Sequence, residues 1–118
     1  MRCLFFIFCF NCFLSFSQNT DEKLAAQYFN DKKYQEAADL YEKLASKQLE
    51  SVYYYDNLLQ CYVLLNDFKS AEKLVDKRIR KFNEIYTYRV DKAYLFQLQN
   101  LDDKKEDVFK SLLKIQIL

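Results

Sequence analysis

The sequence contains no glycine, proline, histidine or tryptophan among its 118 residues. Without histidine, the chain lacks the commonest metal ligand and the side chain most often used as a general base. Without glycine, it cannot form a glycine-rich phosphate-binding loop, and the tightest hairpin turns are disfavoured. We therefore predict an all-α chain that is not an enzyme and that holds no metal or other cofactor.

Positive and negative charges are nearly balanced, with 18 Lys and Arg against 17 Asp and Glu. Arg2 is the only charged residue before Gln18, so residues 18–118 are formally neutral. A neutral chain has no long-range field that would attract nucleic acid or a membrane surface, and neither is expected as a partner. The densest basic run, Asp76 to Lys81, is interpreted as cations near a helix C-terminus, where the helix dipole favours them.

The N-terminal segment, Met1 to Ser17, resembles a secretory signal peptide. Arg2 precedes an apolar run rich in phenylalanine, and the small residues Ser15 and Ser17 suit cleavage before Gln18. A helix that spans a bilayer needs about 20 apolar residues, and the polar residues from Gln18 onward end this run too early. We therefore expect an exported protein, periplasmic or extracellular, with no membrane contact after cleavage. An uncleaved membrane anchor is the alternative.

Only one cysteine, Cys61, lies outside this N-terminal segment. A single cysteine cannot form an intramolecular disulfide. Its position on a predicted helix favours a buried small hydrophobic residue, and an intermolecular disulfide is the alternative.

The sequence repeats itself with a period of about 34 residues, which is typical of stacked arrays of helix pairs. The stretch from Leu24 to Leu44 returns from Leu58 to Arg78 with similar residue types at matching positions. The matched pairs are Leu24 and Leu58, Tyr28 and Tyr62, Tyr34 and Phe68, Ala37 and Ala71, and Glu42 and Asp76. We call the separation of 34 residues between the two members of each pair the repeat period. It predicts an array of stacked helix pairs.

Apolar residues recur at three- and four-residue steps, which predicts six helices joined by short turns that use Asn and Asp. The predicted helices cover residues 20–30, 33–46, 51–65, 68–81, 85–99 and 103–115. In the last pair, Lys105 stands where alanine is expected and Asp102 where an aromatic residue is expected. The third repeat is therefore degenerate.

The period and the residue types resemble the tetratricopeptide repeat family. In the second helix of the first two pairs, an aromatic residue stands three positions before Ala, at Tyr34 and Ala37 and at Phe68 and Ala71. The short side chains of Ala37 and Ala71 allow the two antiparallel helices of a pair to approach closely. The resemblance implies an α-solenoid of antiparallel helix pairs that winds as a right-handed superhelix. Its repeats would cover residues 18–51, 52–85 and 86–118, after the signal peptide at 1–17.

The resemblance also implies a function, because the concave face of such a solenoid binds peptides or partner proteins through the first helix of each pair. Carried over by position, the candidate partner-binding residues are Glu22, Ala26, Phe29 and Asn30, then Tyr53, Asp56, Gln60 and Val63, and finally Val90, Tyr94 and Gln97. Clustered tyrosines are common in binding surfaces because they bury a large area at small entropic cost. We predict a scaffold or adaptor of the bacterial cell envelope.

Two alternatives remain open. The sequence ends in an apolar stretch, Leu112 to Leu118, whereas repeat arrays usually end in a polar capping helix. Either further repeats follow in a longer parent protein that carries the function, or this helix associates with a second copy or a partner. The other alternative is a membrane-tethered helical protein that keeps its N-terminal segment.

Overall fold

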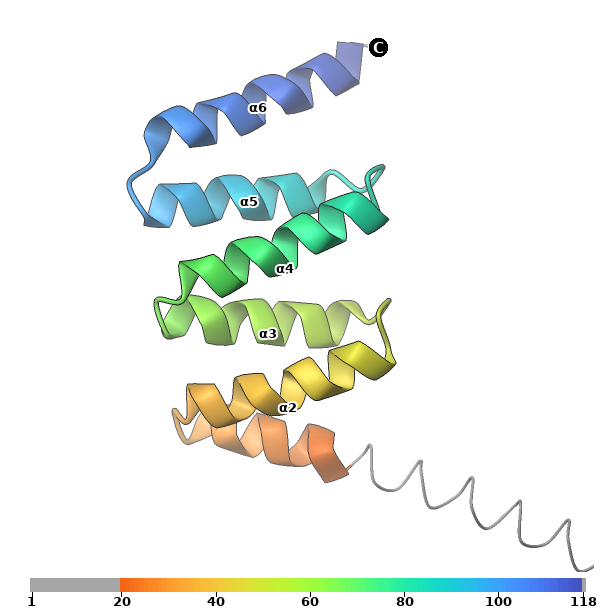
Figure 1. Cartoon of the computed structure of the whole chain (residues 1–118), viewed down its shortest axis with the longest axis vertical. Coiled ribbons are helices and arrows are strands. Elements are labelled where there is room, and N and C mark those ends of the chain that lie inside the picture. The colour runs from red at the N-terminus through yellow and green to blue at the C-terminus, as the bar shows by residue number, and fades with distance from the viewer. Residues whose placement is uncertain (1–19, 118) are drawn as a thin grey trace, which may run out of the picture. The chain divides into compact units, whose positions relative to one another are not determined.

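The computed structural model describes residues 20–117, with side chains up to Lys114. Within this range the chain forms six helices and no strand (Figure 1). The first helix covers residues 20–30, and it is followed by α2 (Tyr34–Lys47), α3 (Val52–Leu64), α4 (Phe68–Lys81), α5 (Thr87–Leu98) and α6 (Asp102–Ile117). None of the helices in this part of the chain is long and apolar enough to cross a membrane. The predicted signal peptide, residues 1–17, lies outside the described residues.

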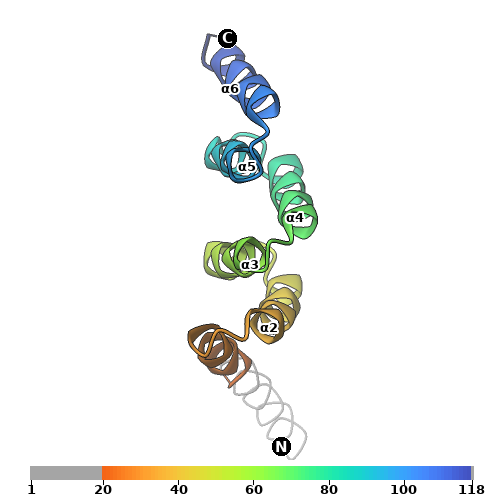
Figure 2. The same ribbon diagram turned by 90° about the vertical axis from the view of Figure 1, so that its left-hand side faces the viewer.

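The chain divides within α3 into two compact units. Unit 1 extends to Cys61 and contains the helix at 20–30, α2 and most of α3. Unit 2 begins at Tyr62 and contains the end of α3 together with α4, α5 and α6. In unit 2, α5 packs on both α4 and α6, and successive helices run across the view in opposite directions (Figure 1). Figure 2, in which α5 is seen nearly along its axis, shows α4 and α6 on different sides of it.

The same turn joins the two helices of each repeat, and it recurs at the predicted repeat period. Lys32, Asn66 and Asn100 have positive φ angles of 61°, 55° and 58°. The residue after each of them donates its N–H to a carbonyl five positions back. These bonds run from Lys33 to Tyr28, from Asp67 to Tyr62 and from Leu101 to Phe96, at 2.8, 2.9 and 2.9 Å. This is the Schellman motif that commonly ends helices, so the third repeat keeps the backbone geometry of the other two.

The predicted helices are confirmed, with ends that differ from the observed ones by at most two residues. Asparagine at two of the three left-handed positions replaces the usual glycine, because its short polar side chain tolerates that conformation. Asp67 then caps α4, since its carboxylate accepts a hydrogen bond of 3.2 Å from the backbone N–H of Ser70. A hydrogen bond with the Ser70 side chain, followed by this backbone bond, holds the pKa of the Asp67 carboxyl below its usual value.

In unit 1, small and aromatic side chains form the core between α2 and α3. Ala37 and Cys61 are fully buried, and the side chain of Tyr41 is only 1% exposed. The ring of Tyr41 meets the ring of Tyr53 on α3 edge to face, with 6.4 Å between the ring centroids. Such pairs stabilise a packed interface beyond the area that they bury.

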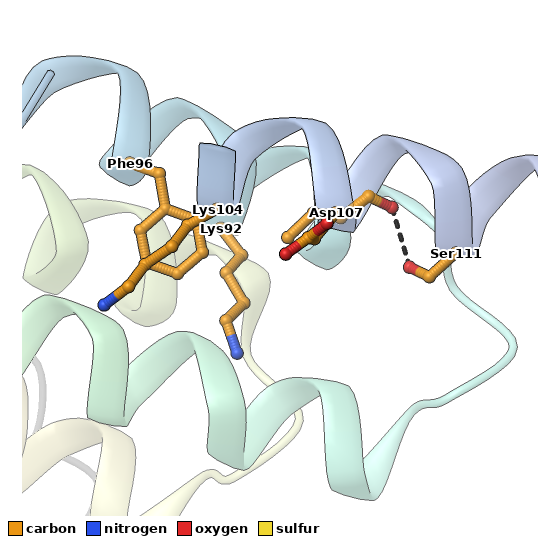
Figure 3. A pocket seen from close by; sticks show the side chains of 6 residues that line it. Lys92, Phe96, Lys104, Asp107 and Ser111 are labelled. Carbon is orange, nitrogen blue, oxygen red and sulfur yellow. Dashed lines mark hydrogen bonds between the residues drawn. The ribbon is translucent and has the colours of Figure 1, made fainter. Parts of the chain in front are cut away.

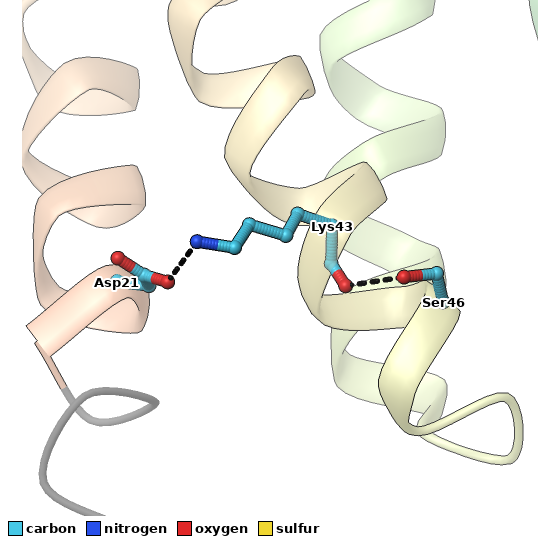
Figure 4. Close-up of polar contacts among 3 residues, drawn as sticks. All are labelled: Asp21, Lys43 and Ser46. Atoms are coloured by element: carbon cyan, nitrogen blue, oxygen red, sulfur yellow. Dashed lines mark hydrogen bonds and ion pairs between the residues drawn. The ribbon is translucent and has the colours of Figure 1, made fainter. Parts of the chain in front are cut away.

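Polar contacts join the helix at 20–30 to α2 and to α3. The hydroxyl of the buried Tyr54 on α3 donates to a carboxylate oxygen of Glu22 at 2.9 Å. The ammonium group of Lys43 on α2 lies 3.0 Å from the carboxylate of Asp21 (Figure 4). The first contact involves a buried side chain and fixes the register of two helices, whereas an exposed ion pair contributes at most about 1 kcal/mol.

In unit 2, the core of α4 contains an unexpected charged residue. Ala71 and Val75 are fully buried, as the apolar pattern predicts, but Arg78 is also buried, with 7% exposure. Its guanidinium lies 5.4 Å from the ring centroid of Phe82 and 5.6 Å from that of Tyr88 on α5. One cation of the run that we interpreted as helix-terminal charge therefore lies in the core, where aromatic faces attract it.

Candidate functional site

The predicted partner-binding residues all lie on the first helices of the repeats, at 20–30, α3 and α5, and none of them is fully buried. Seven are exposed, namely Asn30, Tyr53, Asp56, Gln60, Val90, Tyr94 and Gln97. Four are partly buried, namely Glu22, Ala26, Phe29 and Val63. Partner binding by these residues stays a prediction.

In unit 1, several of the predicted residues make contacts that hold the helices together. Glu22 accepts the hydrogen bond from Tyr54, and the ring of Phe29 packs against Tyr34 of α2 with 5.4 Å between centroids. Tyr53 packs against Tyr54 at 5.7 Å but is still 50% exposed. The carboxylate of Glu22 and the ring of Phe29 are thus engaged inside the unit, while half of the Tyr53 surface is exposed.

In unit 2, large side chains form an exposed stripe along α5. Tyr86, Val90, Tyr94 and Leu98 are 44%, 49%, 52% and 38% exposed. Residues four apart lie on the same face of a helix, and the N–H of Val90 bonds to the carbonyl of Tyr86, so the helical spacing includes Tyr86. We call these four residues the α5 stripe. The resemblance predicted Val90 and Tyr94 but missed the two residues at its ends.

Charged side chains are absent from the outward face of α5. The exposed residues of this helix are Thr87, Val90, Tyr94, Gln97 and Leu98. Its charged residues, Arg89, Asp91 and Lys92, are partly buried. Arg89 donates to the carbonyl of Asn83 at 2.7 Å, and the ammonium of Lys92 lies 2.6 Å from the carboxylate of Asp76 on α4. The usual pattern of a surface helix, with charges outward, is reversed here.

The outward face of α4 has the opposite chemistry. Every exposed residue of this helix is basic, and these residues are Lys69, Lys73, Lys77, Arg80 and Lys81. Its two acids are partly buried and hydrogen-bonded, Asp76 to Lys92 of α5 and Glu72 to Gln99, the residue after α5. Unit 2 therefore has a basic outward face on α4 and an uncharged, largely apolar outward face on α5.

The α5 stripe could not be assigned from the sequence, because α5 is apolar on two sides. Tyr88, Leu95 and Phe96 are buried on one side, with exposures of 6%, 0% and 7%, and the stripe lies on the other. Apolar residues on two sides of a helix are ordinarily interpreted as a sign that both sides are buried. The only available signal was the regular four-residue spacing from Tyr86 to Leu98.

A shallow hollow lies between α5 and α6, with a volume of about 280 Å³ (Figure 3). The ring of Phe96 forms part of its wall, and the ammonium groups of Lys92 and Lys104 lie 5.9 and 5.8 Å from the centroid of this ring. Asp107 and Ser111 line it from α6. Its volume falls just below the range of about 300–1,000 Å³ typical of small-molecule pockets, and we assign no ligand to it.

Cys61 is confirmed as a buried residue, with 0% exposure. Burial raises the pKa of its thiol to about 11. A thiol with such a pKa is almost entirely protonated at neutral pH, and the thiolate is the reactive form. These properties favour a packing role over an intermolecular disulfide.

A comparison with known families locates one repeat directly. Residues 23–46 match the family model described as Tetratricopeptide repeat, and this range covers most of the helix at 20–30 and of α2. No curated protein and no solved structure matched the sequence. Together with the six helices of residues 20–117, the match identifies an all-α helical repeat solenoid. Tetratricopeptide repeats typically mediate protein–protein binding, which indicates an interaction module.

Proposed function

We propose that this protein is a non-enzymatic adaptor that binds a protein or peptide partner on the first helices of its repeats, with the α5 stripe as the main contact. The observation that carries the proposal is the exposure of four large, uncharged side chains in a row along one helix. Contiguous apolar patches on soluble domains typically mark sites of interaction. The tetratricopeptide match and the lack of histidine in the sequence support an adaptor rather than an enzyme.

Tyr94 is the residue on which we expect most of the binding energy to depend. It is the most exposed member of the stripe, at 52%, and it has a stripe neighbour four residues away on each side. Tyrosine is enriched among the few interface residues that dominate affinity, and such residues lie near the centre of the contact. Val90 and Leu98 would then surround it and exclude water.

Replacing Tyr94 with alanine should weaken partner binding about tenfold or more, because a large aromatic side chain at the centre of the contact is lost. The tagged full-length protein would be recovered from cells of its source, and co-purifying proteins would be quantified by mass spectrometry. Lys73→Ala, an exposed position on α4, serves as the matched control. Circular dichroism should show equal helicity in all three proteins. Equal recovery of every co-purifying protein with Tyr94→Ala would exclude Tyr94 from the binding surface.

The location of the adaptor is also a proposal, namely the bacterial cell envelope after export and cleavage before Gln18. It is supported by the single positive charge, the apolar run and the small residues Ser15 and Ser17. N-terminal sequencing of the protein isolated from its source should find Gln18 as the first residue. Isolation of a protein that still begins at Met1 would favour the membrane-tethered alternative.

A further inference from the structure

Five cations lie in a row along the outward face of α4. Lys69, Lys73, Lys77 and Lys81 stand four residues apart, Arg80 stands three residues after Lys77, and all five are exposed. Residues three or four apart share one face of a helix. At about 1.5 Å of rise per residue, the row is about 18 Å long. We call these five residues the α4 basic face.

No carboxylate in the part of the chain that the structure describes forms an ion pair with the α4 basic face. The two acids of α4 bond elsewhere, Asp76 to Lys92 at 2.6 Å and Glu72 to Gln99 at 3.0 Å. Like charges four residues apart repel, and the helix dipole disfavours a cation in the first turn, where Lys69 lies. The dipole therefore accounts for the cations of the last turn of α4 but not for those of its first half.

The repeat fold does not require a basic face at this place. At the repeat period, the five positions correspond to Gln35, Asp39, Lys43, Ser46 and Lys47 in α2, and to Asp103, Asp107, Ser111, Lys114 and Ile115 in α6. Two lysines and one acid give the α2 set a net charge of +1, and one lysine and two acids give the α6 set a net charge of −1. The charge of +5 is thus particular to α4, and its self-repulsion lowers the stability of the free helix.

The composition of the α4 basic face indicates which kind of anionic surface it fits. Every exposed residue of α4 is basic, so the face has no apolar anchor for a protein pocket, and lysine is depleted at protein interfaces. Binding of single-stranded nucleic acid uses aromatic side chains on which bases stack, and duplex-binding domains are strongly basic as a whole, whereas this chain has a net charge of +1. An anionic lipid surface needs neither, because clustered Lys and Arg are attracted to its headgroups by charge.

We infer that the α4 basic face holds the protein against a membrane surface that carries anionic phospholipid headgroups. The contact is peripheral, because Ala71 and Val75 on the other side of α4 are fully buried in unit 2 and no apolar side chain of this helix is exposed for insertion. At physiological ionic strength charges act over about 8 Å, so the local row of cations decides the contact rather than the net charge of the chain. This inference replaces the expectation, drawn from the net charge, that no membrane surface is a partner. It goes beyond the proposed function and does not depend on the α5 stripe.

The test is sedimentation of the purified protein with lipid vesicles, made either of phosphatidylcholine alone or of phosphatidylcholine mixed with anionic phosphatidylglycerol. The mixed vesicles should bind more protein, and added salt should remove the difference because it screens the charges. Binding through the apolar N-terminal segment would be the same for both kinds of vesicle. Equal binding to the two kinds of vesicle would overturn the inference.

Replacing both Lys73 and Lys77 with glutamine should weaken binding to the mixed vesicles about tenfold or more, since each cation near an anionic surface contributes to the affinity. The same double change at Lys110 and Lys114 of α6, which are also exposed and four residues apart, is the matched control and should have a much smaller effect. Neither variant should unfold at a lower temperature than the wild type, because each change removes a pair of like charges. Equal weakening by the two double variants, or binding of soluble polyglutamate in place of the vesicles, would overturn the inference. Tyr94→Ala should bind the vesicles as the wild type does, so this test and that of the proposed function can fail independently.

Discussion

Replacing Ala71 with leucine is expected to lower the free energy of unfolding by about 1–3 kcal/mol, because the site has no room for additional carbon atoms. Ala71 is 0% exposed in α4, and Ala37, its equivalent in α2, is also 0% exposed. Interiors are packed as densely as organic crystals, so a larger side chain forces neighbouring helices apart or into strained rotamers. The change should be measured by chemical denaturation monitored by circular dichroism.

Lys73→Leu is the control, because it introduces the same side chain at an exposed position of the same helix. It should change stability by only a few tenths of a kcal/mol, as surface substitutions usually do. The third repeat offers a second comparison, since Lys105 occupies the equivalent position and is only partly buried. Lys105→Leu should be tolerated. An unchanged unfolding curve for Ala71→Leu would contradict the close packing of helix pairs on which the repeat assignment depends.

Raising the pH from 9 to 11 is expected to destabilise the folded protein through the buried thiol of Cys61. Its pKa is about 11 in the folded state, against an ordinary value of 9.0 when exposed. The folded state therefore holds its proton more tightly, and this contribution to stability is complete below pH 9 and is lost as the pH rises through 11. A shift of this size corresponds to a loss on the order of 2 kcal/mol.

Tyr41 should add to the same effect at still higher pH. Burial, followed by a side-chain hydrogen bond with Tyr53, raises the pKa of its phenol above the ordinary value of 10.0. Denaturant unfolding should be measured at several pH values between 8 and 11 for the wild type and for Cys61→Ala. The variant should be less stable at pH 8 but should lose less stability between pH 9 and 11. Parallel pH profiles for the two proteins would contradict the burial of Cys61.

The helices could be predicted from the sequence because their signals are local. Asn30, Asn66 and Asn100 mark the ends of the first helices, and apolar residues recur between them with helical spacing. The residues with a left-handed backbone, Lys32, Asn66 and Asn100, are evenly spaced because each follows the end of a first helix. Local backbone preferences and the apolar period therefore determine most of the secondary structure.

The burial of Arg78 was not predicted, because its residue type favours an exposed position. In the sequence, Arg78 stands among Lys77, Arg80 and Lys81, which are exposed, and only its match to the buried Leu44 at the repeat period distinguishes it from them. Its burial requires the ring of Tyr88 from α5, which the helix packing brings to 5.6 Å. A charged side chain is stable in the core only where neighbouring groups compensate for the loss of its hydration, and these groups come from another helix.

The candidate binding surface was predicted only in part for a related reason. The resemblance places Val90 and Tyr94 correctly on an exposed face, but it also includes Glu22 and Phe29, which make contacts within unit 1. The sequence shows that α5 has apolar residues on two sides but not which of the two sides is covered. That choice is made by the packing of α5 against α4 and α6.

The central claim, that the α5 stripe contacts a partner protein, is tested most directly by photo-crosslinking in the cells that make the protein. A photoreactive phenylalanine analogue would replace Tyr94 in one sample and Lys73, on the basic face of α4, in another. We predict a discrete crosslinked product containing a second protein from position 94 and little or none from position 73. The absence of any product from position 94, or the same products from both positions, would contradict the claim.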